Sequence, residues 1–120
     1  MLSVLLIDDD TDLLEMVETV LTNSSMRVET STSGASLMKS LNQSSPDIIV
    51  MDIYLGDSDG RNLCKGLKSS KEYGHIPVIL YSAGVITPES ILEAGADEFI
   101  PKPFRIDELI KKIKELTSAT

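Results

Sequence analysis

Residues 3–10 read Ser-Val-Leu-Leu-Ile-Asp-Asp-Asp, a short leucine-rich run that stops at three consecutive acids. An apolar run of this length, bounded by polar residues, is typical of a strand that is buried on both faces. The segment that follows, residues 12–21, carries leucine and valine at helical spacing and predicts a helix. The chain therefore opens with a strand, an acidic turn and a helix.

The same order recurs along the rest of the chain. Further strands are expected over residues 26–30, 47–51, 77–81 and 98–100, and further helices through residues 37–41, 63–68, 88–94 and 106–116. The fourth helix has clear boundaries, because residues 87–89 (Thr-Pro-Glu) suit a helix start and Gly95 suits a helix end. Five strands alternating with five helices predict an α/β fold with a mostly parallel, doubly wound sheet.

Length and composition set the outer limits of the interpretation. The chain has 120 residues, of which 42% are hydrophobic and 25% are charged, so we expect one domain over residues 1–120. The one cysteine, Cys64, cannot form an internal disulfide. The N-terminus shows no basic region and only a short apolar stretch, which predicts neither a signal peptide nor membrane insertion. We therefore expect a cytoplasmic protein.

The charge balance narrows the partners. Eleven basic against 19 acidic residues give a net charge of −8 and a pI near 4.5. No basic stripe is present to neutralise phosphates, and the 4% aromatic content leaves few platforms for stacking bases. Direct binding of nucleic acid is therefore disfavoured.

Polar residues follow the predicted strands at the point where each strand ends. In parallel sheets the binding crevice lies at the carboxyl ends of the strands, so residues far apart in the chain meet at one edge. The residues expected at this edge are Asp8, Asp9, Asp52, Ser82 and Lys102.

Three carboxylates at one edge either raise one another's pKa values or bind a cation. A hard divalent cation such as Mg²⁺ suits oxygen ligands, whereas Zn²⁺ normally requires cysteine or histidine. Asp52, next to a cation and a lysine, is a plausible nucleophile towards phosphorus, with Ser82 as a hydrogen-bond donor. An alternative interpretation is that residues 8–12 merely cap a helix.

The candidate residues lie within short motifs that follow one another along the chain. These are residues 7–10 (Ile-Asp-Asp-Asp), Asp52 followed by 59–60 (Asp-Gly), 80–83 (Leu-Tyr-Ser-Ala), 95–97 (Gly-Ala-Asp) and 102–104 (Lys-Pro-Phe). In this order and spacing they resemble the receiver domain of bacterial two-component response regulators, over essentially the whole chain. The resemblance implies a flavodoxin-like (CheY-like) sheet with strand order 2-1-3-4-5.

The resemblance also implies a function. Asp52 would accept a phosphoryl group from a phosphohistidine of a sensor histidine kinase or histidine phosphotransferase. Asp9 and Asp52 would bind Mg²⁺ directly, the backbone carbonyl of Tyr54 would complete the protein ligands, and Asp8 would hold a metal-bound water. Lys102 would contact the phosphoryl oxygens.

The remaining implications concern the switch and its output. Ser82 would move towards the phosphoryl group and the rotamer of Phe99 would follow, altering the binding of a downstream protein partner or of an output domain missing from this sequence. The family usually has a cis bond at Lys102-Pro103, and Ala83 matches a small residue at the phosphoryl entrance. Such a domain is not an enzyme in the usual sense, since it catalyses only its own phosphorylation and autodephosphorylation.

Three features depart from the family pattern. Gly56 stands where proline is common, and Arg105 stands where a helix-capping acid is common. The segment from Ser82 to Gly95 is short for the family, so the resemblance does not imply that the fourth helix forms the usual output face.

Two other functions stay open. A haloacid-dehalogenase-type phosphatase also uses aspartate, Mg²⁺, serine or threonine, and lysine, although Asp12 departs from its first motif and 120 residues leave little for a substrate cap. A flavodoxin-like FMN binder is the other alternative, but the acidic turn after the first strand would repel the FMN phosphate.

Overall fold

Five strands and five helices alternate along residues 1–118, the part of the chain that this computed structural model describes. They are β1 (Ser3–Ile7), α1 (Thr11–Asn23), β2 (Arg27–Ser31), α2 (Leu37–Gln43), β3 (Ile48–Asp52), α3 (Gly60–Ser69), β4 (Val78–Ser82), α4 (Pro88–Ala94), β5 (Glu98–Pro101) and α5 (Ile106–Thr117). Each element that the sequence predicts is present, and in the predicted order.

All strand pairs are parallel, and the sheet has the order β2-β1-β3-β4-β5. Both halves of the chain therefore start at the centre of the sheet and wind outward, as in a doubly wound sheet. The predicted fold class and strand order are confirmed. The register pairs Ile7 with Met51 and Asp52 with Tyr81, so the carboxyl ends of β1, β3 and β4 lie at the same edge.

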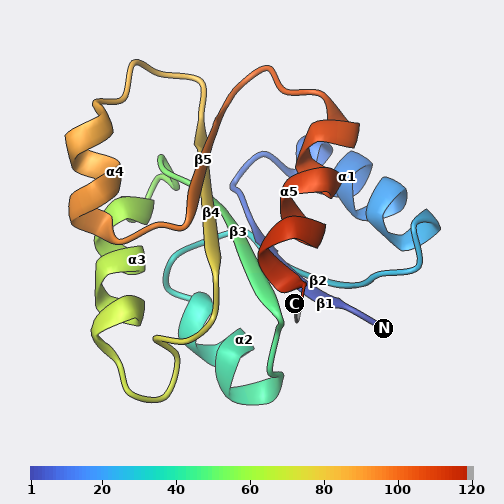
Figure 1. Cartoon of the computed structure of the whole chain (residues 1–120), viewed down its shortest axis with the longest axis horizontal. Helices are drawn as coiled ribbons and strands as arrows, with labels where there is room; N and C mark the ends of the chain where they lie inside the picture. The colour runs from blue at the N-terminus through green and yellow to red at the C-terminus, as the bar shows by residue number, and fades with distance from the viewer. Residues whose placement is uncertain (119–120) are drawn as a thin grey trace.

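Helices cover both faces of the sheet (Figure 1). One core packs α2, α3 and α4 against alternate strand residues such as Leu5, Ile49 and Leu80, and it encloses Cys64 of α3. The other packs α1 and α5 against the intervening residues, such as Leu6 and Val50. Because successive strand side chains point to opposite faces, each inner strand reads as a continuous apolar run.

Three strands begin and end one residue later than the sequence suggests. The apolar runs predict β2, β3 and β4 over 26–30, 47–51 and 77–81, with Asp52 and Ser82 just beyond their strands. Both are instead the last residues of β3 and β4, because Asp52 pairs with Tyr81 and Ser82 pairs with Pro101. The backbone ladder, rather than the end of the apolar run, decides where the strand stops.

The caps of the last two helices follow the sequence. Thr87 caps α4 by accepting a hydrogen bond from the backbone N–H of Ser90, and Gly95 ends it with φ +77°. Arg105 stands at the N-cap of α5 and makes no side-chain capping bond.

In the described part of the chain, no helix combines the length and apolar character that a membrane crossing requires.

Candidate functional site

The carboxyl ends of β1 and β3 bring three carboxylates together. Oxygen atoms of Asp8, Asp9 and Asp52 all lie within 4.8 Å of one another. Asp8 is fully buried, Asp52 is 7% exposed and Asp9 is open to solvent. The predicted meeting of these three residues at one edge is confirmed by their positions.

Lys102, just beyond β5, reaches into this group. Its Nζ lies 3.2 Å from Oδ2 of Asp8 and 3.2 Å from Oδ2 of Asp52, across 94 and 50 residues of sequence. The peptide bond between Lys102 and Pro103 is cis, as expected. One ammonium group therefore faces two buried carboxylates, which leaves the cluster short of positive charge.

Tyr81 of β4 supplies a further contact to Asp8 that the sequence analysis missed. Its hydroxyl donates to Oδ2 of Asp8 at 2.7 Å, while Oδ1 of Asp8 accepts from the backbone N–H of Asp10 at 2.8 Å. Burial, followed by the negative charge of Asp8, raises the pKa of Tyr81, so the phenol stays protonated and continues to donate. Lys102 Nζ lies 4.7 Å from the centre of the same ring.

The electrostatics around Asp52 suit a cation. Burial raises the pKa of Asp52, the negative charge of Asp8 raises it further, and Lys102 lowers it only in part. An additional positive charge beside the three carboxylates would stabilise the charged form of Asp52. Their oxygen donors suit Mg²⁺ better than a metal that prefers nitrogen or sulfur.

The turn after β3 is pressed against the backbone of Asp52. A Cβ on Gly60 would lie 2.5 Å from the carbonyl oxygen of Asp52, so the Asp59-Gly60 pair permits an approach that a side chain would block. The backbone N–H of Tyr54 donates to Oδ1 of Asp52 at 3.3 Å, which fixes the Tyr54 peptide beside the carboxylates. The Tyr54 side chain is 51% exposed.

The remaining predicted residues lie around the same edge. Ser82 is fully buried, and its hydroxyl accepts a hydrogen bond from the backbone N–H of Gly84 at 3.2 Å. Ala83 is exposed beside it. Phe99 of β5 is partly buried against the core under α2, α3 and α4.

Residues 4–114 match the response regulator receiver domain over nearly the whole chain. The chain belongs to this family. Receiver domains are the signalling domains of two-component response regulators, and this receiver domain has the family's sheet and the acidic group at its carboxyl edge.

Individual relatives agree with this assignment. The transcriptional regulatory protein GltR of Pseudomonas aeruginosa is 33% identical over 95% of this chain, and the heme response regulator HssR of Staphylococcus epidermidis is 36% identical over 95% of it. The matches cover 48% and 50% of those proteins, so the receiver domain spans about half the length of the curated relatives it matches. The receiver domain of Francisella response regulator 1452 superposes with a TM-score of 0.89 at 29% identity, covering 98% of this chain and 97% of that chain.

Two other acids of the receiver domain, Asp10 and Asp57, accept hydrogen bonds from backbone N–H groups. Asp10 caps α1 by accepting from the backbone N–H of Leu13 at 3.1 Å, so the helix-capping interpretation holds for Asp10 but does not describe Asp8. Asp57 accepts from the backbone N–H groups of Gly34 and Ala35, which lowers the pKa of Asp57. Among the described residues these acids lie outside the three-carboxylate group.

Proposed function

We propose that Asp52 of this receiver domain accepts a phosphoryl group from a phosphohistidine of a sensor histidine kinase or histidine phosphotransferase, in a Mg²⁺-dependent reaction. One observation carries the proposal. The Asp52 carboxylate lies at the carboxyl edge of the sheet. Lys102 Nζ is 3.2 Å from Oδ2 of Asp52, and oxygens of two further carboxylates lie within 4.8 Å. This combination supplies a nucleophile and the positive charge that phosphoryl transfer demands.

The transfer of the phosphoryl group needs no reactant besides the donor phosphohistidine and Asp52. A carboxylate oxygen of Asp52 forms a bond to phosphorus while the bond from phosphorus to the donor histidine nitrogen breaks, and its electron pair stays on that nitrogen. The product is an acyl phosphate on Asp52. The ammonium group of Lys102, already in contact with Oδ2, is in position to hold the phosphoryl oxygens.

The metal would be held by this chain's own oxygens. Asp9 and Asp52 would bind Mg²⁺ directly, with the backbone carbonyl of Tyr54 as a third ligand and Asp8 orienting a bound water. When bound, Mg²⁺ supplies the positive charge that offsets the carboxylates and the phosphoryl oxygens. Asp8 is suited to an orienting role, because Tyr81, Lys102 and the Asp10 amide already fix both of its oxygens.

Phosphorylation would be transmitted through Ser82 and Phe99. The Ser82 hydroxyl accepts from Gly84, and its own proton is available to donate to a phosphoryl oxygen. A shift at Ser82 would leave room for a new Phe99 rotamer, altering the affinity of a downstream protein partner or of an output domain. We further infer that residues 1–120 form one receiver domain, that it works in the cytoplasm, and that its catalysis is limited to its own phosphorylation and autodephosphorylation.

The test is to supply Mg²⁺ and acetyl phosphate and to follow labelling of Asp52 by intact mass and peptide mapping. Wild-type protein should gain one phosphoryl group, and Asp52→Asn should gain none. Asp57→Asn is the matched control, because it removes an exposed acid from the same turn. Labelling of Asp52→Asn at the wild-type rate would falsify the assignment.

The two alternative functions have no observation in their favour. In a dehalogenase-type phosphatase Asp8 would be the nucleophile, yet its oxygens are buried and bonded to Tyr81, Lys102 and the Asp10 amide. Steady hydrolysis of a phosphate monoester, lost in Asp8→Asn, would revive that function. Yellow flavin bound to the purified protein would do the same for an FMN binder.

A further inference from the structure

The first turn of α4 is weakly held by the core. Within α4, all of which the structure describes, Ala94 in the last turn is the only buried residue. The preceding loop contains Val85, which is fully exposed, and Leu92 of α4 is 79% exposed. Its apolar anchoring comes from Ile86 and Ile91, which are only partly buried against the core under α2, α3 and α4. The segment from residue 84 to residue 90 therefore has few buried apolar contacts to lose when it moves.

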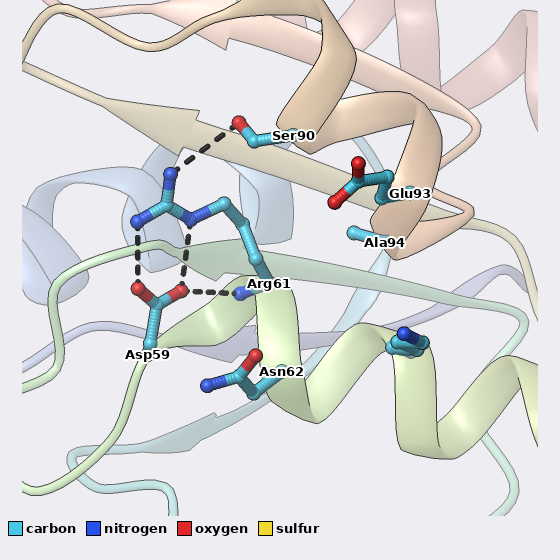
Figure 2. Close-up of a pocket in the computed structure, with 7 residues that line it drawn as sticks. Asp59, Arg61, Asn62, Ser90, Glu93 and Ala94 are labelled. Atoms are coloured by element: carbon cyan, nitrogen blue, oxygen red, sulfur yellow. Dashed lines mark hydrogen bonds and ion pairs between the residues drawn. The ribbon is translucent and has the colours of Figure 1, made fainter.

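A polar hollow separates this turn from α3. It has a volume of about 230 Å³ and is lined by Asp59, Arg61, Asn62, Lys65, Ser90, Glu93 and Ala94 (Figure 2). No close-packed apolar interface fills the space among these lining residues. Movement of the first turn of α4 therefore requires little repacking at the hollow itself, and a polar contact that crosses the hollow helps to position the turn.

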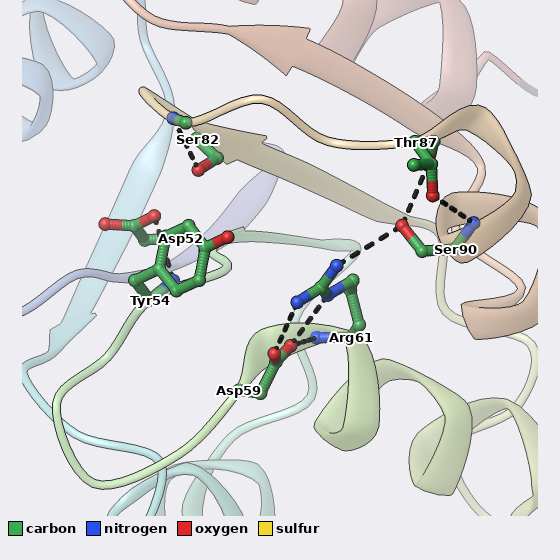
Figure 3. Close-up of polar contacts among 8 residues, drawn as sticks. Asp52, Tyr54, Asp59, Arg61, Ser82, Thr87 and Ser90 are labelled. Atoms are coloured by element: carbon green, nitrogen blue, oxygen red, sulfur yellow. Dashed lines mark hydrogen bonds and ion pairs between the residues drawn. The ribbon is translucent and has the colours of Figure 1, made fainter.

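Arg61 makes such a contact. Its Nη1 donates to Oγ of Ser90 at 3.3 Å, and Ser90 Oγ in turn donates to the backbone carbonyl of Thr87 at 2.9 Å. On its other side the guanidinium donates to both carboxylate oxygens of Asp59, at 3.0 Å from Nε and 2.7 Å from Nη2. Figure 3 shows this chain of contacts running from the start of α3 to the start of α4.

The side chain of Arg61 is not required to cap α3. The cap is the hydrogen bond from the backbone N–H of Arg61 to Oδ1 of Asp59, which any residue except proline provides at this position. The guanidinium instead extends to Ser90, 29 residues away, with Asp59 fixing its orientation. The guanidinium of Arg61 therefore acts between α3 and α4 rather than within α3.

The same guanidinium also faces the turn after Asp52. It lies 5.9 Å from the centre of the Tyr54 ring. That ring packs at Gly84, where an added Cβ would lie 3.3 Å from a ring carbon. The backbone N–H of Gly84 donates to the Ser82 hydroxyl. Contacts thus run from Ser82 to Tyr54 and Arg61, and from Arg61 to Ser90.

We propose that Arg61 is a positioning residue, which ties the first turn of α4 to the turn after Asp52 and holds residues 84–90 where the structure shows them. The inference rests on the proposed function and adds to it what opposes the switch. When the Ser82 hydroxyl turns towards a phosphoryl group on Asp52, Gly84 and the loop behind it follow. The Arg61 to Ser90 contact resists that shift, so loss of the guanidinium favours the phosphorylated arrangement.

The first measurement needs no phosphoryl donor. Amide hydrogen exchange of residues 84–92 is followed in wild type, Arg61→Ala and Ser90→Ala. Exchange should rise roughly two- to fivefold in both variants, the range expected for a partly exposed charged contact. Arg105→Ala is the matched control, since Arg105 also pairs with an aspartate two residues away but reaches no other helix.

The second measurement uses a beryllofluoride complex as the phosphoryl mimic, in the presence of Mg²⁺. The affinity of the protein for beryllofluoride should rise in both Arg61→Ala and Ser90→Ala, and should not change in Arg105→Ala. The double variant should exceed Arg61→Ala by less than Ser90→Ala exceeds wild type, because the two residues share the Arg61 to Ser90 contact. A purely structural role for Arg61 would speed exchange without raising this affinity.

The outcomes separate the inference from the proposed function. If Arg61→Ala exchanges no faster than Arg105→Ala, or if its affinity for beryllofluoride is unchanged or lower, the inference is overturned while the phosphoacceptor assignment stands. If wild type binds no beryllofluoride and Asp52 takes no label, the proposed function fails. Hydrogen exchange alone then decides whether Arg61 holds α4.

Discussion

The group around Asp8 and the first turn of α4 lie at the same edge of one sheet and are built in opposite ways. Asp8, Tyr81, Lys102 and Asp52 sit on or next to strands, are buried or half-buried, and are joined by bonds of 2.7–3.2 Å. The turn that begins α4 has one polar contact from Arg61 across a hollow. The chemistry that we propose therefore lies on the tightly bonded part of the receiver domain, and the movement that we propose lies on the weakly packed part.

This difference has a physical basis. Groups that bind a metal and a phosphoryl oxygen need fixed positions, which buried strands with satisfied polar atoms provide. A segment that changes position at low cost must have few buried apolar contacts to lose. Substitutions in the two regions should therefore differ in kind as well as in size.

The largest effect is expected at Lys102. Lys102→Ala removes the ammonium group that contacts both Asp8 and Asp52, so labelling of Asp52 by acetyl phosphate should slow roughly 100-fold or more. Lys112→Ala is the control. Lys112 also pairs with an acid, since its Nζ lies 3.3 Å from Oε2 of Glu98, but this pair is not part of the site. Equal rates for the two lysine variants would show that Lys102 does not take part.

Tyr81 should dominate the stability of the rigid region. Tyr81→Phe leaves buried Asp8 without its 2.7 Å donor and should lower the free energy of unfolding by about 1–2 kcal/mol. Tyr73→Phe removes an equally short hydroxyl bond, from Tyr73 to the side chain of Asn42 at the surface, and should cost less than about 0.5 kcal/mol. Urea denaturation measures both, and similar losses would contradict the comparison.

The pH dependence of stability should have opposite signs at two acids. The pKa of Asp52 is raised above 3.8 by burial and by Asp8, so the folded state loses stability as the pH rises from 3.8 through that raised value. Without Mg²⁺, Asp52→Asn should therefore be more stable than wild type at pH 7, by less than Tyr81→Phe loses, and the gain should vanish at low pH.

Asp57 is the matched case with the reverse sign. Its pKa is lowered by the amides of Gly34 and Ala35, so its contribution is present above pH 3.8 and is lost as the pH falls through the lowered value. Asp57→Asn should then be less stable than wild type at pH 7. Thermal unfolding from pH 3 to pH 8 measures both variants, and the same sign for the two would contradict the assignment.

The smallest global effect is expected at Thr87. Thr87→Ala removes the side-chain cap of α4, which accepts from the Ser90 N–H at 3.3 Å. The free energy of unfolding should fall by less than about 0.5 kcal/mol, because α4 buries so little, while exchange of the Ser90 amide rises roughly fivefold. Thr87→Ser retains the hydroxyl and should behave like wild type. A global loss as large as that of Tyr81→Phe would show that α4 is part of the rigid region.

Much of the fold and of the candidate site follows from local sequence signals. Apolar runs that end on Asp8, Asp52 and Ser82 place the strands within a residue, and parallel topology then brings these residues to one edge with Lys102. Strand ends shifted by one residue because ladder pairing, rather than side-chain polarity, decides them. The roles of Asp52 and its neighbours in phosphoryl transfer remain predictions.

The contacts of Tyr81 with Asp8 and of Arg61 with Ser90 could not be predicted from the sequence pattern, because they depend on side-chain direction. Tyr81 lies in the predicted strand 77–81, and the sequence pattern assigns its side chain no partner. A phenol in a fully buried strand needs a hydrogen-bond acceptor, and that need could have pointed to Asp8. No motif in the sequence pointed to Arg61. Its reach to Ser90 depends on the rotamer of a long side chain and on the angle between two helices, neither of which a local pattern contains.

Cys64 gives the receiver domain a built-in probe of its own opening. The thiol is fully buried in the core under α3, and burial raises the pKa of Cys64 to about 11, so almost none of it is thiolate at neutral pH. It is also the one cysteine of the sequence. A thiol reagent should therefore react only with molecules that have opened this core, and cysteines introduced on α4 should be labelled selectively while Cys64 stays protected.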